Sequence, residues 1–236
     1  MSMICVGNSH IVAISKGAAL AGKEIVEFRL REMKKSEKLT QKALEEQVGH
    51  QLVAAVQKHQ AQKVYCFCGG GMHVALGLVQ HPLRFDFIMP DGIDRVFDDT
   101  AILVPFDVIR SLMAFKIRKH LRLLRYLSEI VPAKLVQHEP PPPVADGAFL
   151  REAAATYDPD AATYGISAPH LRLKLWQLHN QLFREFCASN NIEYVINPSE
   201  VFDGDGFLAE PYWGDYVHGN AQYGAAVLHK LEELRP

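Results

Sequence analysis

Short apolar runs alternate along the chain with longer segments whose apolar residues recur at helical spacing. Five runs predict strands, at residues 3–6, 25–30, 64–68, 134–138 and 194–196. Four longer segments predict helices, at residues 40–60, 108–131, 171–187 and 221–234. Strands that alternate with helices are typical of a parallel sheet covered on both faces. We therefore predict an α/β fold with a five-stranded, mostly parallel sheet in the strand order 2-1-3-4-5.

The segment between the third and fourth predicted strands is too long for a simple crossover. It holds paired apolar runs, with a small hairpin expected at residues 101–105, and then a long basic helix. We interpret residues 80–132 as an insertion within a single domain spanning residues 1–236, although a chain of this length also has room for two domains. Part of this insertion is expected to border the functional edge of the sheet.

Composition and charge exclude several classes of protein. The 236 residues are 48% hydrophobic and 22% charged, with a net charge of -2, which is typical of a globular chain. This balance predicts no nucleic-acid partner, and no apolar stretch approaches the ~18 residues of a transmembrane segment. The first residues do not resemble a signal peptide, so we expect a cytoplasmic protein with reduced, buried cysteines. The oligomeric state stays open.

The long helix of the insertion carries six basic residues before its first acid. They are Arg110, Lys116, Arg118, Lys119, Arg122 and Arg125. A basic amphipathic helix can lie on a membrane or bind phosphates. Because the overall charge is balanced, we interpret this face as the solvated side of a helix that packs over the site.

The carboxyl ends of the predicted strands hold the candidate chemistry, because ligands of doubly wound sheets bind beyond those ends. Ser9 follows the first strand, Gly69–Gly71 and His73 follow the third, and Asp215 and His218 precede the last helix. A serine hydroxyl is a weak nucleophile and needs a nearby base. The spacing of Asp215 and His218 would place both on one face of a helical turn, with the carboxylate fixing the imidazole that faces Ser9. The pattern predicts a Ser-His-Asp triad.

These motifs resemble those of the SGNH hydrolases, also called GDSL-type esterases and lipases. The turn Gly7–His10 stands where that family has its G-D-S turn, and Asp215–His218 stands where it has D-x-x-H. The resemblance implies a three-layer, flavodoxin-like fold and a serine esterase without metal or organic cofactor. Its substrate would be an acyl or acetyl ester of a lipid, sugar or other small molecule. Ser9 would be the nucleophile, His218 the base and then the acid, and Asp215 the residue that orients His218.

Two positions depart from the family pattern, and both concern the oxyanion hole. The family's donor asparagine after the third strand is replaced by Gly71, and residues 29–40 lack the family's donor glycine. The backbone amides of Ser9, Gly70 and Gly71 remain candidates for this role, although one lost donor can cost about 10²–10³ in rate. Two alternatives therefore stay open: a catalytically weak or inactive binding protein, and an acyltransferase to a sugar that uses the same residues.

Four further residues are candidates for substrate binding because they flank these motifs: Asn8, His10, His73 and Trp213. Trp213 precedes the D-x-x-H motif and is a candidate wall for an acyl or sugar pocket. Ordinary packing is the competing interpretation, both for Trp213 and for a buried His73.

Metal binding by the histidines and phosphate binding by the glycine turn are two further interpretations. A metal site built from His10, His73, His138 and His218 lacks the spacing of known metal motifs, so no metal is predicted. The turn Gly69–Gly71 lacks the surrounding residues of a nucleotide-binding loop, so its phosphate signal is weak.

Overall fold

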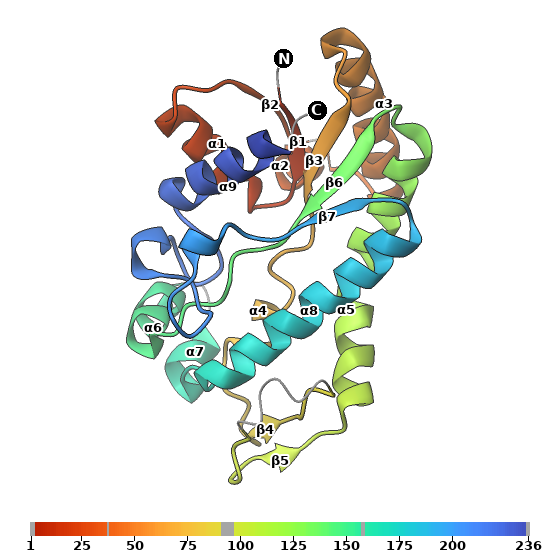
Figure 1. Cartoon of the computed structure of the whole chain (residues 1–236). Helices are drawn as coiled ribbons and strands as arrows, with labels where there is room; N and C mark the ends of the chain where they lie inside the picture. Colours follow the sequence, from red (N-terminus) through yellow and green to blue (C-terminus); the bar gives the residue numbers. More distant parts are fainter. Residues whose placement is uncertain (1–2, 37, 91–96, 157–158, 235–236) are drawn as a thin grey trace.

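A five-stranded parallel sheet forms the centre of the computed structural model, which describes residues 3–36, 38–90, 97–156 and 159–234 (Figure 1). Its strands are β1 (Met3–Gly7), β2 (Ile25–Arg29), β3 (Lys63–Phe67), β6 (Lys134–His138) and β7 (Glu193–Val195). They lie in the order β2-β1-β3-β6-β7, and every neighbouring pair is parallel. The predicted α/β class and strand order are confirmed.

Helices cover both faces of this sheet and make three layers (Figure 1). One face packs against α3 (Gln41–His59), α5 (Phe106–Ile130) and α8 (Pro169–Ser189). The other packs against α1 (Ile11–Leu20) and α9 (Ala221–Glu233). Successive side chains of a strand point to opposite faces, so each strand supplies both cores.

The remaining elements are short. They are α2 (Leu30–Ser36), α4 (Val74–Gly77), α6 (Gly147–Ala155), α7 (Pro159–Tyr164), the two-residue strands β4 (Phe85–Asp86) and β5 (Ile102–Leu103), and the 3-10 turns η1 (Ser199–Val201) and η2 (Glu210–Tyr212). The strand expected at residues 25–30 ends one residue early, because Leu30 already begins α2.

The prediction of a small hairpin at residues 101–105 is wrong. β5 instead pairs in parallel with β4, from the start of the same insertion. The side chain of Lys174, on α8, is fully buried beneath this pair. Its ammonium donates to the carboxylate of Asp86 and, at 2.8 Å, to the carbonyl of Phe87. A buried charge needs such partners, so this ion pair fastens the insertion to α8.

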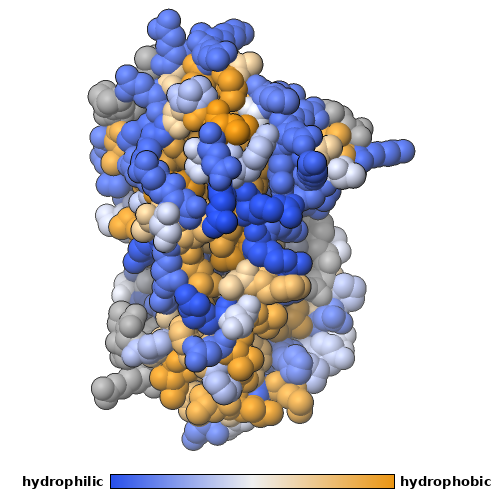
Figure 2. Space-filling view, turned by 90° about the vertical axis from the view of Figure 1, so that its right-hand side faces the viewer, coloured by the Kyte–Doolittle hydropathy of each residue, from blue (hydrophilic) through white to orange (hydrophobic). Residues whose placement is uncertain are grey.

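Exposed apolar side chains gather on the insertion, over β4, β5 and the first turns of α5 (Figure 2). The largest are Leu83, Ile88, Ile102, Leu103, Val108, Leu112 and Phe115. Leu112, near the start of α5, is 41% exposed. In the part of the chain that the structure describes, no helix has both the length and the apolar composition needed to cross a membrane.

The helices α1 and α9 cross with their backbones in contact. A Cβ atom added at Gly17 would lie 2.3 Å from the amide nitrogen of Ala225, and one added at Gly224 would lie 1.9 Å from the carbonyl oxygen of Ala13. No side chain larger than hydrogen fits at either position without moving a helix. Because Ser9 lies just before α1 and His218 just before α9, this crossing brings the two candidate residues together.

We expect Gly224→Ala to lower the free energy of unfolding by about 3 kcal/mol, because the backbone of α1 cannot make room for the added methyl group. In an ordinary helix the same change is stabilising. Gly147→Ala is the matched control, since Gly147 begins α6 and has nothing within 4 Å of its Cβ position. Urea unfolding of both variants measures the effect. Equal stability of the two variants would contradict the close crossing.

Candidate active site

Ser9 lies in the turn between β1 and α1, and this turn is tied to the one that follows β3. The amide of Asn8 donates to the carbonyl of Phe67 at 3.2 Å, and the Asn8 side-chain oxygen accepts from the amide of Gly69 at 3.2 Å. Two neighbouring strand ends are thus held side by side at the carboxyl edge of the sheet. Asn8, predicted to bind substrate, has a structural role here through its side-chain oxygen.

Asp215 and His218 lie in a loop before α9 and not on the helical turn that their spacing suggested. One carboxylate oxygen of Asp215 accepts from the amides of Val217 at 2.7 Å and His218 at 2.8 Å, which folds the loop back on itself. Asn220 then begins α9 by accepting from the amides of Gln222 and Tyr223. The local chain therefore fixes the position of the aspartate relative to the histidine.

A continuous chain of hydrogen bonds joins the three predicted residues. His218 Nδ1 lies 2.8 Å from the nearer carboxylate oxygen of Asp215, and His218 Nε2 lies 2.7 Å from Ser9 Oγ. An ionised carboxylate only accepts hydrogen bonds, so Nδ1 carries the proton and Nε2 accepts from the serine hydroxyl. The structure brings these three side chains together in the order that a serine nucleophile requires.

The surroundings keep the carboxylate of Asp215 ionised. Burial by itself raises the pKa of Asp215, but the hydrogen bond and charge of His218 and the amides of Val217 and His218 outweigh it, so the net shift is downward. His10 packs against His218 with ring centroids 4.7 Å apart and the ring planes tilted by 57°. Burial, and then the neighbouring His218, lower the pKa of His10 to about 3, so its ring stays neutral at neutral pH.

The glycine turn after β3 lies against His10. A Cβ atom on Gly70 would come within 2.7 Å of the His10 ring, and one on Gly71 would lie 3.1 Å from Val217 Cγ1. The ring of His179 holds the turn from the other side, with Nε2 3.0 Å from the Gly69 carbonyl oxygen. Among the described residues, the amides of Ser9, Gly70 and Gly71 make no hydrogen bond. Their donor capacity is therefore available to a ligand.

The other predicted binding residues fall in different places. His73 is buried and lines a narrow pocket with Asp215 and His218. Burial and the neighbouring His179 hold the pKa of His73 well below its ordinary value.

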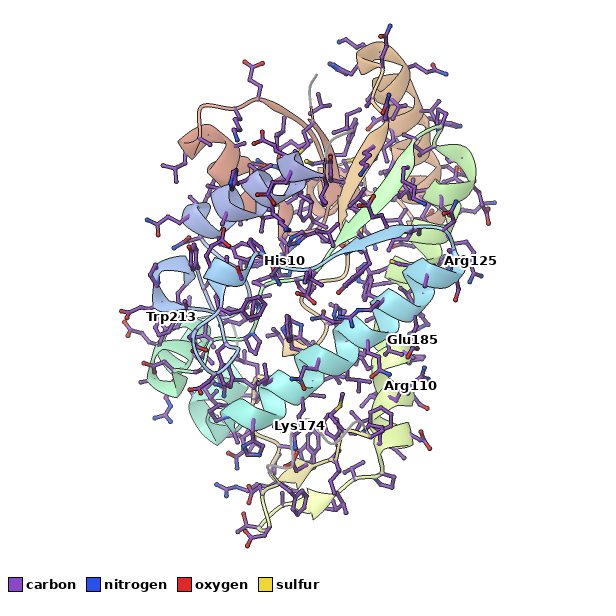
Figure 3. The ribbon with its side chains drawn as sticks, in the orientation of Figure 1. His10, Arg110, Arg125, Lys174, Glu185 and Trp213 are labelled. Carbon is purple, nitrogen blue, oxygen red and sulfur yellow. The ribbon has the colours of Figure 1, made fainter. Side chains whose placement is uncertain are left out.

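Trp213 packs against Phe149 with ring centroids 4.8 Å apart and donates to the carbonyl of Leu208 at 2.7 Å. In the view of Figure 3, Trp213 lies to the left of His10. Trp213 does not line this pocket, so the structure favours packing as its role.

Each residue of the Ser9–His218 pair lines a different cavity. The narrow pocket beside His218 has a volume of about 20 Å³ and mostly apolar walls. A larger cavity of about 480 Å³ contains Ser9 and is lined by residues of α2 and α5. Sequence reasoning missed the α2 wall, because the segment after β2 was not recognised as a helix. It did single out Lys119 of α5, as one of several basic residues on a helix near the site.

The described residues contain no group of three or more metal-ligating side chains that could hold a metal ion. Of the four histidines considered in the sequence, His10 and His218 lie against each other, His73 lies edge-on to His179, and His138 packs against Phe67.

Comparisons with known proteins bear on the fold. Neither a scan against models of protein families nor a search of curated proteins finds a match. Among solved structures, a Streptococcus pneumonia protein provisionally assigned as a platelet activating factor is similar over 99% of this chain and 83% of its own, with a TM-score of 0.50 and 12% identity. A GDSL-like lipase from Bacteroides thetaiotaomicron is similar over 99% of this chain and 89% of its own, with a TM-score of 0.48 and 10% identity.

Est24, a carbohydrate acetylesterase from Sinorhizobium meliloti, is similar over 99% of both chains, with a TM-score of 0.43 and 12% identity. The sheet order and the layers are those that the sequence predicted, and the likeness to the Streptococcus pneumonia protein, at a TM-score of 0.50, agrees with this three-layer α/β fold. At such identities the likeness concerns the fold alone, and the chemistry has to be argued from the site.

Buried histidines make a pH-dependent contribution to the free energy of unfolding. Burial is the main cause that lowers the pKa of His10 to about 3 and the pKa values of His120 and His138 to about 4, from an ordinary value of 6.5. The unfolded chain therefore binds more protons than the folded one below pH 6.5, and stability falls as the pH falls. Between pH 6 and pH 5, each of these histidines lowers the free energy of unfolding by up to about 1.4 kcal/mol per pH unit.

We expect His138→Gln to reduce this slope by about 1.4 kcal/mol per pH unit, because it removes one buried titrating group. His229→Gln is the matched control, since the side chain of His229 is 72% exposed. Urea unfolding at pH 7.5, 6 and 5 gives the slope for each protein. The prediction is wrong if His138→Gln keeps the slope of the unmodified protein.

Proposed function

We propose that this protein is a serine-dependent hydrolase of esters, with Ser9 as nucleophile, His218 as general base and then acid, and Asp215 as the residue that orients His218. The observation that carries the proposal is the unbroken hydrogen-bond chain from Ser9 Oγ through both ring nitrogens of His218 to the Asp215 carboxylate. A serine hydroxyl becomes an effective nucleophile when a base in this position takes its proton.

In the first half-reaction Ser9 Oγ attacks the ester carbonyl and its proton passes to His218 Nε2. The tetrahedral intermediate then expels the alcohol, which takes that proton, and leaves an acyl group on Ser9. In the second half-reaction water attacks the acyl group by the same route and releases the acid. Asp215 stays ionised throughout and stabilises the imidazolium, while the neutral His10 ring adds no repulsion beside it.

The negative charge that develops on the carbonyl oxygen needs donors. We assign this role to the backbone amides of Ser9, Gly70 and Gly71, which have no partner among the described residues. The glycines lie beside His10 and Val217, next to the triad. This assignment replaces the side-chain donor that Gly71 lacks, and it gives the chemistry no need for a metal or an organic cofactor.

The narrow pocket beside His218 limits the size of the acyl group. A volume of about 20 Å³ has room for a group of about the size of one water molecule or a methyl group. Its walls include the apolar side chains of Val74, Leu150 and Leu208. We therefore assign acetyl and similarly short acyl esters as substrates.

Replacing the triad residues tests the proposal. Ser9→Ala and His218→Ala are each expected to lower kcat for a short-chain aryl ester at least about 10³-fold, because nucleophile and base act as one unit. Asp215→Asn is expected to lower kcat by the same factor or by a smaller one, because it misorients the imidazole without removing it. His229→Ala, on the exposed face of α9, is the control for a lost histidine.

Labelling by a phosphonate probe, located by mass spectrometry, reports on Ser9 directly. Equal residual rates for the unmodified protein and Ser9→Ala across several acyl lengths, with no label on Ser9, would favour a binding protein without turnover. Transfer of the acyl group to an added alcohol in preference to water would favour the acyltransferase.

Acyl length tests the assignment of the narrow pocket. We expect kcat/KM to fall at least about tenfold from an acetyl to a hexanoyl ester with the same alcohol, because the longer chain cannot enter. Leu150→Ala should raise the hexanoyl-to-acetyl ratio, since Leu150 lines the pocket. Leu228→Ala is the matched control, because Leu228 belongs to the same core but does not line the pocket. A flat dependence on acyl length would contradict the assignment.

A further inference from the structure

The larger cavity at Ser9 is lined by basic side chains from two helices. Its lining comprises Asn8, Ser9, Leu30, Arg31, Lys34, Lys35, Gln41, Leu44, Lys119, His120 and Leu123. Four of these residues are cationic, and none is an aspartate or a glutamate. A wall of one charge sign beside a nucleophile selects ligands of the opposite sign.

The positive charge comes from residues that folding brings together. Arg31, Lys34 and Lys35 lie three and four residues apart on α2, so they share one face of that helix. Lys119 lies on α5, more than eighty residues further along the chain. Like charges that lie close together repel one another, so this arrangement has an electrostatic cost.

Acidic residues on the surrounding elements do not neutralise this wall. Glu32 pairs with Arg29 at 3.1 Å, and Glu45 pairs with Arg122 at 2.9 Å. Within residues 3–36, 38–90, 97–156 and 159–234, none of the four lining cations forms an ion pair with a carboxylate. Their charge is available to a ligand.

Burial divides the cavity into an apolar interior and a charged mouth. Leu30, Leu44 and Leu123 are 2–4% exposed, whereas the four cationic residues are exposed. His120 is 8% exposed, and its Nε2 has no hydrogen-bond partner among the described residues. A ligand that reaches Ser9 therefore passes from cationic groups to a neutral, mostly apolar surface with one unpaired histidine nitrogen.

We propose that the alcohol part of the ester substrate carries a phosphate group, which binds Arg31, Lys34, Lys35 and Lys119 while the ester carbonyl lies at Ser9. This inference rests on the proposed function and adds the substrate class. A phosphate dianion offers several acceptor oxygens to a cluster of ammonium groups and one guanidinium, whereas a neutral alcohol offers no charge. The short acyl group occupies the narrow pocket that His218 lines. A short acyl group and a charged phosphate together make the substrate a soluble phosphorylated ester.

Two acetate esters with leaving groups of similar acidity test this inference: 4-methoxyphenyl acetate and the same compound with a phosphate in place of the methoxy group. Release of the phenol is followed by chromatography. At low salt we expect kcat/KM to be at least about tenfold higher for the phosphate-bearing ester. This advantage should shrink in 0.5 M NaCl, because salt screens exposed charges.

Variants identify the residues responsible. Lys34→Gln/Lys35→Gln and Lys119→Gln should each lower the ratio of the two kcat/KM values severalfold. Lys58→Gln is the matched control, because Lys58 is exposed and lies about 25 Å along α3 from Gln41, the residue of α3 that begins the cavity wall. A ratio near one in the unmodified protein, or a ratio that all the variants share, would overturn the inference and leave the esterase proposal intact.

Binding to Ser9→Ala separates the two proposals. Calorimetry with this variant should show tighter binding of the phosphate-bearing ester than of the neutral one, and the added Lys119→Gln change should reduce the difference severalfold. If neither ester is hydrolysed by the unmodified protein but this selectivity persists, the hydrolase proposal fails and the phosphate site stands. Equal weak binding of both esters overturns the phosphate site.

A vesicle experiment tests a lipid headgroup as the source of the phosphate. If the protein sediments preferentially with phosphatidylglycerol vesicles, the lysine variants do not, and the soluble ester shows no selectivity, the cations bind a lipid headgroup. That result would overturn the soluble substrate.

Discussion

The contact between the backbones of α1 and α9 is the constraint on which the site depends. Gly17 and Gly224 allow the two helices to touch, because neither presents a side chain at the crossing. Ser9 and His218 stand just before these helices, so the same contact sets the 2.7 Å distance between Ser9 Oγ and His218 Nε2. The geometry of the Ser9, His218 and Asp215 side chains is therefore a consequence of packing on one face of the sheet, and the hydrogen bonds of the turns adjust it locally.

Charge is distributed around this geometry in two zones. Around the glycine turn, His10, His73 and His179 are buried and their pKa values are lowered mainly by burial. Their rings therefore pack around the turn in the neutral form. At the mouth of the larger cavity, exposed cations from α2 and α5 face solvent. A neutral interior strengthens the interaction of His218 with Asp215, while the charged mouth acts on ligands that have not yet reached Ser9.

Several sequence predictions failed for identifiable reasons. The spacing of Asp215 and His218 suggested a helical turn, but an aspartate that accepts two nearby amides produces the same proximity in a loop. The apolar run at residues 102–103 pairs with residues 85–86 in parallel, which local periodicity cannot reveal. For Trp213 the sequence left both a pocket wall and packing open, and its contact with Phe149 favours packing, because a flanking position does not fix the direction of a side chain. The helix α2 is short and polar on most sides, so it left no clear period in the sequence.

The strands, the main helices and the order of the sheet were predictable from the sequence, since apolar periodicity and right-handed crossovers leave few alternatives for an alternating pattern. It also identified Ser9, Asp215 and His218 as a set, because residues that follow parallel strands collect at one edge. The distances among them, the unpaired amides of Gly70 and Gly71 among the described residues, and the meeting of α2 with Lys119 in one cavity appear only in the tertiary structure. These features join residues far apart along the chain, and their positions follow from the packing of whole helices, which no local pattern encodes.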